Sequence, residues 1–316
     1  MANDRPIIGE PPDCWGRSML LVLAISIPAV LVSAQPAMAQ YARAYSNLPE
    51  NTSIIALIYT NTQSDWYTDD DIPTGLKART NAVLVSYNHC FAGFTGNIAC
   101  TGFNLPYNAI YGYNHTLNQV THNEDGIGDP SLTVDYNLFG AKAMSKEEFA
   151  RTPVETFGGL HAAFTVPLGS YDASRVNNIG SNRYAVKITF NLAIPWNDGA
   201  NWFEINPFVR VFSNNNRYLG NNKLSQDPIW GFNTFLSHNL SADLYIQAGA
   251  ILTAGGQADV NGIPAGVVQN NWQGVVGLGT KAWKGASIVG TYSETIYRAS
   301  NNSHNRSFLL LVQQAF

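Results

Sequence analysis

The last residues of the chain follow the pattern of a β-strand whose edge must be covered. In the final stretch RSFLLLVQQAF, every second residue from Phe308 to Val312 is apolar, Gln314 interrupts the pattern, and the aromatic Phe316 comes last. A soluble sheet seldom ends on an unpaired apolar strand, because such an edge promotes aggregation. A closed barrel leaves no edge, since its last strand pairs with its first. The ending therefore predicts a barrel that closes at Phe316.

The beginning of the chain has the pattern of an export signal. Arg17 precedes the apolar run 19–34, and Ala37-Met38-Ala39 forms a small-x-small cleavage site. We expect a signal peptide over residues 1–39 and one mature barrel domain over residues 40–316. A membrane anchor is the alternative, but the run is short for a helical span and contains Pro28.

Composition restricts what the mature domain can be. No later segment approaches about 18 consecutive apolar residues, which excludes a helical membrane protein. Charged residues make up 13% of the chain and aromatic residues 12%. This balance suits a barrel with one lipid face and one polar face. The net charge of −4, without a basic cluster, gives no reason to expect nucleic-acid binding.

Long runs of period-two alternation predict the strands. The clearest runs begin near residues 131, 183, 202 and 241, each with a polar and an apolar face. They last about 9–12 residues, enough to cross a bilayer at a tilt, whereas soluble strands are usually nearer 5–6. We expect about twelve strands. Their starts lie near Ile54, Arg79, Phe103, Ser131, Phe157, Arg183, Trp202, Ile229, Ser241, Asn271, Ala286 and Arg306.

The connections predict a transmembrane topology. Short turns fall at 195–200, 238–239 and 284–285, and long polar loops follow the alternate strands. Short periplasmic turns, long outer loops and an even strand number are typical of outer-membrane barrels. We therefore expect an all-β, antiparallel, up-and-down barrel in the outer membrane of a Gram-negative bacterium, surrounded by its lipids.

Tryptophans at the strand ends support the same orientation. Amphipathic rings favour the two membrane–water interfaces and form belts there. We expect one belt at the short turns and one at the long loops. The first would contain Trp196, Trp202 and Trp283, and the second Trp230 and Trp272.

One longer connection on the short-turn side, between residues 87 and 103, contains Cys90 and Cys100. They are the only cysteines of the mature chain. An even pair in an exported chain predicts a disulfide, here closing a small loop. Metal binding is the weaker alternative, because the adjacent His89 brings the set to only three ligands.

A second longer connection carries a helix start signal. Ser145 and Glu148 form a capping box, which predicts a short surface or plug helix ending near Pro153. In the first long loop, Asp69–Asp71 form an acidic tip. Three adjacent carboxylates do not build a cation cage, so we interpret the tip as solvated.

The face that the alternation assigns to the barrel interior is mixed in charge. It comprises Asp135, His161, Arg183, Lys187, Glu204, Arg210, Asp243 and Tyr245, together with Phe157, Phe208 and Phe212. A barrel of about twelve strands should enclose a narrow interior, wider than eight strands leave. Opposed charges beside aromatic side chains indicate a path for a small, partly apolar solute. For each single residue, the alternative is an ion pair that braces the wall.

Several blocks of sequence, in order, also resemble a known family. GIGDPSLTVDY (126–136), KEEFAR (146–151), VPLGSYD (166–172), IGSNRY (179–184) and SQDP (225–228) match the meta-pathway of phenol degradation family, and the resemblance covers about residues 42–316. It implies a transporter-like outer-membrane barrel, often linked to catabolism of aromatic compounds. It also implies that the strand ending at Phe316 is recognised by the barrel-assembly machinery. It supplies no ligand residues.

These patterns favour a channel for passive uptake of small hydrophobic or aromatic, phenol-like solutes. No nucleotide, metal or haem motif is visible, so we expect no cofactor and no metal. A structural or adhesive barrel is the main alternative, because long Asn-rich loops suit it.

A hydrolase is the weaker alternative. Its candidate bases are His161, His238 and His304. Ser237 and His238 are neighbours on a strand, so they point to opposite faces. No G-x-S-x-G elbow precedes a helix. We therefore do not expect an enzyme.

Overall fold

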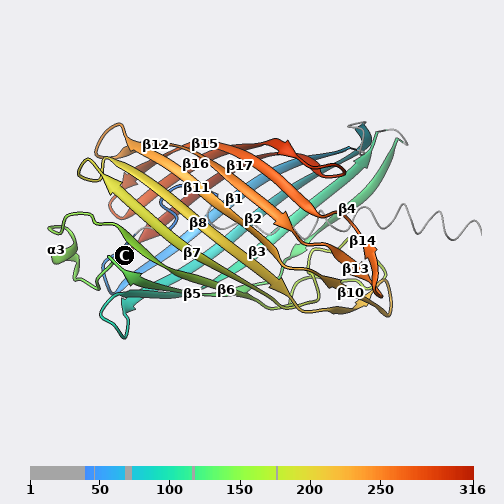
Figure 1. Cartoon of the computed structure of the whole chain (residues 1–316), viewed down its shortest axis with the longest axis horizontal. Helices are drawn as coiled ribbons and strands as arrows, with labels where there is room; N and C mark the ends of the chain where they lie inside the picture. The colour runs from blue at the N-terminus through green and yellow to red at the C-terminus, as the bar shows by residue number, and fades with distance from the viewer. Residues whose placement is uncertain (1–39, 46, 68–72, 116–117, 176) are drawn as a thin grey trace, which may run out of the picture.

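Strand pairing organises most of the chain in the computed structural model (Figure 1), which describes residues 40–316 apart from 46, 68–72, 116–117 and 176. The expected signal peptide and the Asp69–Asp71 tip lie outside the described residues. The elements are β1 (Thr52–Tyr67), β2 (Pro73–Ala92), β3 (Ile98–Asn114), β4 (Gln119–Ile127), β5 (Ser131–Phe139), α3 (Lys146–Phe149), β6 (Phe157–Thr165), β7 (Ala185–Trp196), β8 (Asn201–Phe212), β9 (Asn215–Tyr218), β10 (Asn222–Gln226), β11 (Ile229–Asn239), β12 (Leu244–Gly255), β13 (Ala258–Val260), β14 (Ile263–Ala265), β15 (Gln269–Trp283), β16 (Ala286–Arg298) and β17 (Ser303–Ala315).

The large sheet closes into a twelve-strand antiparallel barrel. Its order is β2-β1-β17-β16-β15-β12-β11-β8-β7-β6-β5-β3-β4, and pairing of β2 with β3 completes the ring. The thirteen strands fill twelve positions in the wall, because β4 and β5 share one position beside β3. β5 pairs with the first part of β3, and β4 pairs with its last part. Pro130, between β4 and β5, has no N–H to donate to a ladder, which suits a break there. The prediction of an up-and-down barrel of this size is confirmed.

The last strand forms the seam of the barrel. β17 pairs with β1 from Ile54 opposite Ala315 to Trp66 opposite Ser303. Phe316 extends this ladder: its N–H donates to the Ser53 carbonyl (2.9 Å), and its own carbonyl accepts from the Ser53 N–H (3.0 Å). The backbone of the final residue is therefore part of the closure.

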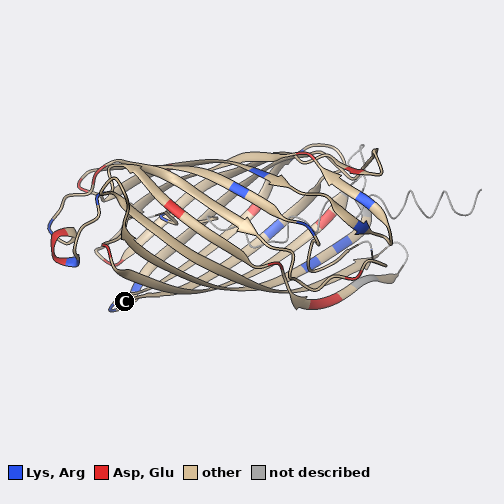
Figure 2. Ribbon diagram, turned by 90° about the horizontal axis from the view of Figure 1, so that it is seen from below, with Lys and Arg blue, Asp and Glu red and all other residues tan. Residues whose placement is uncertain are grey.

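Apolar side chains cover the outer face of the wall. Every wall position has at least one exposed large apolar or aromatic residue there. Examples are Leu57, Val85, Leu105, Leu132, Leu160, Ile188, Val209, Leu236, Ile246, Val276, Tyr292 and Leu310. Much of the wall carries neither acidic nor basic residues (Figure 2). A bilayer covers such a band. Among the described residues, no helix is sufficiently long and apolar to traverse a membrane.

The two ends of the barrel differ. At one end, the short-turn end, lie the carboxy terminus, α3 and the tight turns (Figure 1). At the other, the long-loop end, β9, β10, β13 and β14 form a second sheet in the order β14-β13-β10-β9. Loop 166–184 (without 176) packs on this sheet, since the Gly220 N–H donates to the Ala173 carbonyl (2.7 Å) and Tyr171 Oη donates to the Arg217 carbonyl (2.9 Å). We call this small sheet with loop 166–184 the cap.

The predicted capping box is present at α3. Ser145 Oγ accepts from the Glu148 N–H (3.2 Å), and Glu148 Oε2 accepts from the Ser145 N–H (2.9 Å). The helix buries none of its residues and lies outside the barrel, so it is a surface helix and not a plug.

The strands beside the cysteines are longer than predicted. β2 continues to Ala92 and β3 begins at Ile98, so Cys90 and Cys100 lie directly opposite each other in paired strands, where a disulfide joins them. The predicted disulfide is therefore confirmed, but it lies within paired strands and not in a loop. Alternation marks only the part of a strand with one lipid face, whereas backbone pairing continues beyond it.

Two other predicted positions differ. β12 begins at Leu244 and not near Ser241; Asp243 lies in the preceding turn, exposed, with its carboxylate 3.6 Å from Lys281 Nζ. Asp243 therefore does not belong to the inner face. Trp202 does: it contacts Phe157 edge-on inside the barrel (6.2 Å between centroids), whereas Trp196, Trp230 and Trp283 are exposed. Trp202 shares the parity of the inward-facing Glu204, which could have revealed this.

Candidate functional site in the barrel interior

A segment that precedes β1 lies inside the barrel. We call residues 40–45 the inserted segment. Ala42 is completely buried (0% exposed) against residues of β11, β12 and β15, and Tyr41 packs against residues of β1, β2, β16 and β17. Because these strands come from different parts of the wall, the segment crosses the interior. Sequence reasoning missed it; the only trace was the aromatic–basic spacing of Tyr41, Arg43 and Tyr45.

Glu204 anchors the inserted segment. Both carboxylate oxygens accept the Arg43 backbone N–H (2.8 and 3.0 Å), and Glu204 is only 4% exposed. Arg43 Nε donates to Ser237 Oγ (3.0 Å), and its guanidinium lies 4.3 Å from the ring centroid of Tyr245. A buried carboxylate is stable only with such partners. Glu204 and Tyr245, both assigned to the interior by sequence, thus hold a segment of the same chain.

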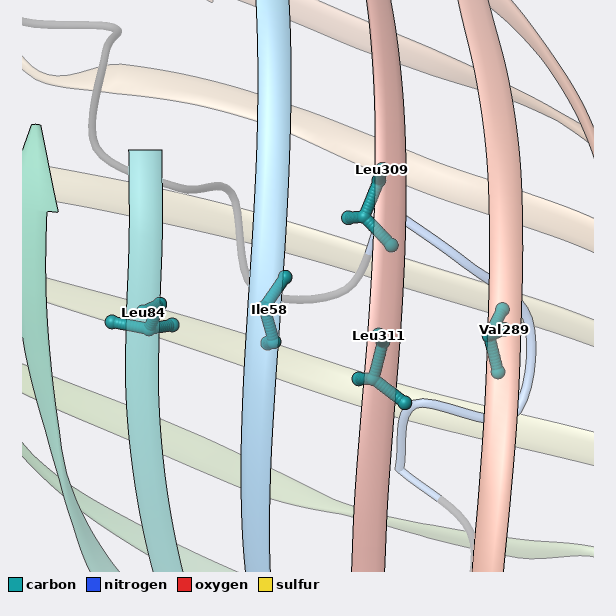
Figure 3. Packing of buried hydrophobic residues seen from close by; sticks show 5 residues of the cluster. All are labelled: Ile58, Leu84, Val289, Leu309 and Leu311. Carbon is teal, nitrogen blue, oxygen red and sulfur yellow. The ribbon is translucent and has the colours of Figure 1, made fainter. Parts of the chain in front are cut away.

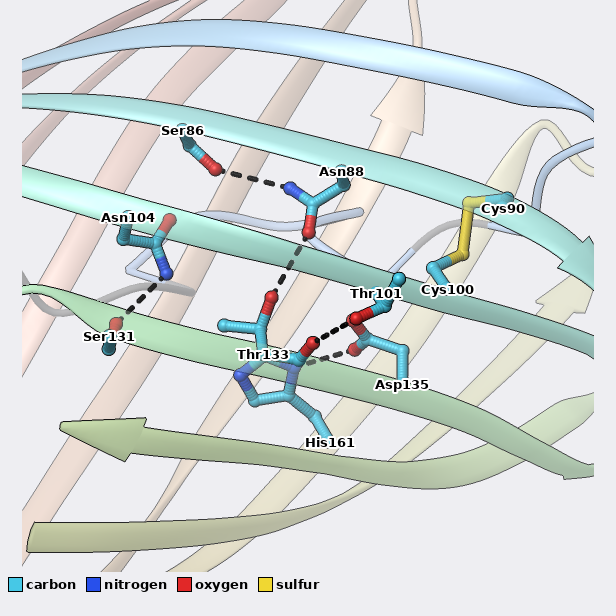
Figure 4. Close-up of polar contacts among 10 residues, drawn as sticks. All are labelled: Ser86, Asn88, Cys90, Cys100, Thr101, Asn104, Ser131, Thr133, Asp135 and His161. Carbon is cyan, nitrogen blue, oxygen red and sulfur yellow. Dashed lines mark hydrogen bonds and ion pairs between the residues drawn. A yellow bond between two sulfur atoms is a disulfide. The ribbon is translucent and has the colours of Figure 1, made fainter.

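Asp135 and His161 pair across β5 and β6. Asp135 Oδ1 and His161 Nδ1 are 2.6 Å apart (Figure 4), and the Tyr45 ring lies 5.3 Å from the His161 ring between centroids. In the described part of the chain, no serine or cysteine hydrogen-bonds to His161. A nucleophile is therefore missing from the acid–base pair that a hydrolase would use.

The other two candidate histidines have different partners. His238 bonds to Asn201 (2.7 Å). His304 bonds to Glu294 (3.0 Å). Neither arrangement brings a serine to a histidine.

A polar row runs over the inner faces of β2, β3, β5 and β6 (Figure 4). Asn88 connects β2 with β5, since its Nδ2 donates to Ser86 Oγ (3.1 Å) and its Oδ1 accepts from Thr133 Oγ1 (3.2 Å). Gly102 lies beneath: a Cβ there would come within 2.2 Å of Asn88 Oδ1. The row therefore depends on a missing side chain on β3.

A neighbouring part of the inner face is aliphatic. We call this the aliphatic patch. It consists of Ile58, Leu84, Val289, Leu309 and Leu311 on β1, β2, β16 and β17 (Figure 3). The expectation of a mixed polar interior missed it. The uninterrupted apolar run 308–311 was the available signal, because a strand buried on both faces loses its alternation.

Three cationic side chains gather near the long-loop end. Lys187 on β7 lies directly opposite Arg210 on β8, and Arg183 precedes β7. We call these three residues the cationic cluster. Lys187 Nζ lies 4.4 Å from the Phe208 ring centroid, and the Arg183 and Arg210 guanidinium carbons lie 4.3 and 5.1 Å from that of Phe212. Sequence alternation assigned all five to the interior; the structure brings them together.

Arg183 is the most enclosed member of the cluster. It is 2% exposed, and its Nη2 donates to Gln226 Oε1 of β10 (2.6 Å). Burial lowers the pKa of Arg183 to about 10, and the charge of Arg210 acts in the same direction. Arg183 therefore links the cap to the wall while its charge is held away from water.

Asp129, at the break between β4 and β5, connects the wall to the cap. Its carboxylate accepts from the Gly169 N–H (2.9 Å), the Ser181 N–H (2.7 Å) and Ser181 Oγ (2.6 Å). A Cβ at Gly169 would lie 2.8 Å from Asp129 Oδ1, so only glycine fits. Three blocks separated in sequence, 126–136, 166–172 and 179–184, thus meet at one carboxylate.

Comparison with solved structures agrees with this architecture. The chain is similar to an outer membrane channel from Pseudomonas putida F1, with a TM-score of 0.74 and 15% identity over 86% of this chain and 98% of that chain. It is also similar to the β domain of the Bordetella autotransporter BrkA, with a TM-score of 0.51 and 10% identity over 84% of this chain and 100% of that chain. At these identities the similarity concerns the fold. No curated protein matches the sequence.

A family model gives the more specific result. Residues 60–285 match the family described as "Putative MetA-pathway of phenol degradation". The match extends from β1 to the turn between β15 and β16, well over half of the chain. The protein is therefore an outer-membrane β-barrel that belongs to the MetA-pathway phenol degradation family.

Proposed function

We propose that this barrel is a channel for the passive uptake of small hydrophobic or aromatic solutes across the outer membrane. The observation that carries the proposal is the aliphatic patch. A water-filled pore has a polar lining, whereas here five aliphatic side chains face the interior of a membrane barrel. Ligand sites for apolar molecules combine such surfaces with a few polar groups.

The aromatic side chains in the interior suit an aromatic solute. Tyr41 and Tyr245 pack against the patch, and Phe208 and Phe212 lie nearer the long-loop end. Aromatic rings contact other rings favourably in offset or edge-on geometry. The family description, which names phenol degradation, supports an aromatic solute. The similarity to an outer membrane channel from Pseudomonas putida F1 supports a channel.

The inserted segment would regulate passage. It occupies the interior beside the patch, so a solute passes only where the segment shifts. The channel needs no cofactor and no chemistry of its own, and we propose that it is not an enzyme. Outer-membrane lipids surround the wall, and the barrel-assembly machinery would recognise the strand that ends at Phe316. A purely structural or adhesive barrel would not need an apolar inner surface.

Solute flux into proteoliposomes tests the proposal. Phenol and toluene should enter liposomes that contain the barrel faster than empty liposomes. Leu309→Asn, which places an amide in the aliphatic patch, should reduce this flux. The matched control is Leu310→Ala, because Leu310 is its neighbour on the lipid-facing side. Flux no greater than that of empty liposomes would overturn the channel function.

A further inference from the structure

The cationic cluster carries like charges in a geometry that is unfavourable without a counter-ion. Lys187 and Arg210 are direct cross-strand partners on the inner face. Like charges directly opposite each other destabilise a sheet. The charge of Arg210 also acts on both Arg183 and Lys187, so the three form one electrostatic group.

Two members of this group lack an ion-pair partner among the described residues. In the described part of the chain, no carboxylate comes within ion-pairing distance of Lys187 or Arg183. Asp129 is the acid whose charge acts on Arg183 and Arg210, but three donors already bind its oxygens. Lys187 and Arg183 therefore have no carboxylate of their own among the described residues, and Asp129 is already bound by other donors.

One guanidinium nitrogen of the cluster has unused hydrogen-bonding capacity. Arg183 Nη1 is buried, and within the described residues no acceptor reaches it, although Nη2 is bound by Gln226. Buried donors of a charged group are normally satisfied, because leaving one unpaired costs stability. An unsatisfied buried donor beside two further cations is the arrangement that an anionic ligand would complete.

The rings beside the cluster define the rest of the ligand. Phe208 and Phe212 already lie within 4.3–5.1 Å of the three charges, measured to the ring centroids. A small inorganic anion would use the charges and not the rings. A planar aromatic ring with a carboxylate would use both, since its ring contacts the phenylalanines while its charge faces the cations.

We propose that the cationic cluster, with Phe208 and Phe212, is a binding site for small aromatic carboxylates on their way through the barrel. The inference rests on the proposed uptake function and names an ionised subclass of its aromatic solutes. Arg183 and Arg210 bind the carboxylate, Lys187 adds a third charge, and the two rings select the aromatic body. The site lies just below the cap, where a solute entering from outside arrives first.

Calorimetric titration of the purified barrel in detergent tests this site. Benzoate is the probe, benzamide is its neutral counterpart, and acetate is the anion without a ring. Benzoate should bind at least about tenfold more tightly than benzamide, which corresponds to one charge-assisted hydrogen bond. It should also bind more tightly than acetate, which has the charge but no ring to contact the phenylalanines. Lys187→Met should weaken benzoate binding by about tenfold and leave benzamide binding unchanged.

Two variants serve as controls. Lys187→Arg keeps the charge and should bind benzoate like the wild type. Lys281→Met removes an exposed cation that pairs with Asp243 at the opposite end, and should change nothing. Heat-modifiable migration on gels verifies that each variant is folded. If Lys187→Met does not fold, the comparison of the three probes on the wild type decides alone.

The outcomes separate this inference from the channel function. Equal binding of benzoate and benzamide by the wild type would overturn the carboxylate site, and equal binding of acetate would overturn the role of the rings. Phenol flux measured on the same preparation decides the channel function separately. A barrel that conducts phenol without preferring benzoate keeps the first proposal and loses this one.

Discussion

The two ends of the barrel interior accommodate buried charge in different ways. At the short-turn end, Glu204 is satisfied by the Arg43 backbone, and the Arg43 guanidinium is met by Ser237 and Tyr245. At the long-loop end, the cationic cluster has two phenylalanine rings, Gln226 and the through-space charge of Asp129. The first arrangement satisfies a buried carboxylate with a backbone N–H of the same chain. The second leaves Lys187 and Arg183 without a carboxylate partner among the described residues.

This difference indicates where an outside molecule is needed. Desolvating an ion is tolerated only when partners replace its hydration. At the short-turn end, the inserted segment supplies such partners for Glu204, whose carboxylate is bound within the chain. Strongly perturbed, incompletely paired groups concentrate at functional sites. The long-loop end has this property, which is why we place solute recognition there and regulation of passage at the other end.

The largest expected effect comes from breaking the long-loop end at Asp129. Asp129→Ala removes the acceptor of three hydrogen bonds and the carboxylate beside the cluster, so the cap should be destabilised by roughly 3–5 kcal/mol. Limited trypsin digestion should then cut the cap at the exposed Arg217. Asp172→Ala is the control, because Asp172 is an exposed acid of the same cap. A cap that resists trypsin as in the wild type would contradict the role of Asp129.

A somewhat smaller effect should follow from breaking the short-turn end at Arg43. Arg43→Ala keeps the backbone N–H that binds Glu204 but removes the nearby positive charge and the hydrogen bond to Ser237. Docking of the inserted segment should therefore weaken by about 3 kcal/mol. Planar-bilayer conductance should rise because the segment leaves the interior more often. Adding Glu204→Gln should restore much of the low conductance, since no buried charge then lacks a partner. Identical conductance in the single and double variants would show that charge is not what holds the segment.

The smallest effect on stability concerns Phe316. Phe316→Ala keeps the two backbone hydrogen bonds to Ser53 and removes only an exposed ring, so the unfolding free energy should change by about 0.5 kcal/mol or less. Folding into vesicles that contain the barrel-assembly machinery should nevertheless slow, whereas folding into lipid alone should not. Phe316→Tyr retains an aromatic ring and should assemble normally. Equal assembly rates for the wild type, Phe316→Ala and Phe316→Tyr would show that the assembly machinery does not recognise the terminal aromatic ring.

The wall was predictable because one simple rule governs it. Alternation at runs such as 183–194 reflects the contrast between lipid and interior, and the short turns fix which strands are neighbours. The same rule placed Lys187, Arg210 and Glu204 on the inner face. It could not give their grouping, because a cluster also depends on register: only the pairing of Lys187 with Arg210 shows that they are opposed.

The contents of the barrel were not predictable in this way. The inserted segment has no periodicity, and its contacts join residues far apart in sequence, as Arg43 and Glu204 do. The cap likewise assembles from three loops, with Asp129 binding Gly169 and Ser181. The blocks 126–136, 166–172 and 179–184 stood out in the sequence, but the sequence did not show that they contact one another. Alternation also failed at Cys90 and Cys100, where strands continue beyond the lipid.

The reach of the inserted segment has a consequence for the order of folding. Ala42 binds Gln247 across 205 positions of sequence, and Arg43 binds Ser237 across 194. Contacts of such sequence separation form late, because the intervening chain must first be ordered. Tyr41 of the same segment packs against residues of both β1 and β17, which lie side by side only once the barrel has closed. The segment that precedes every strand of the barrel is thus the last part to find its place, and its docking reports that the barrel has closed.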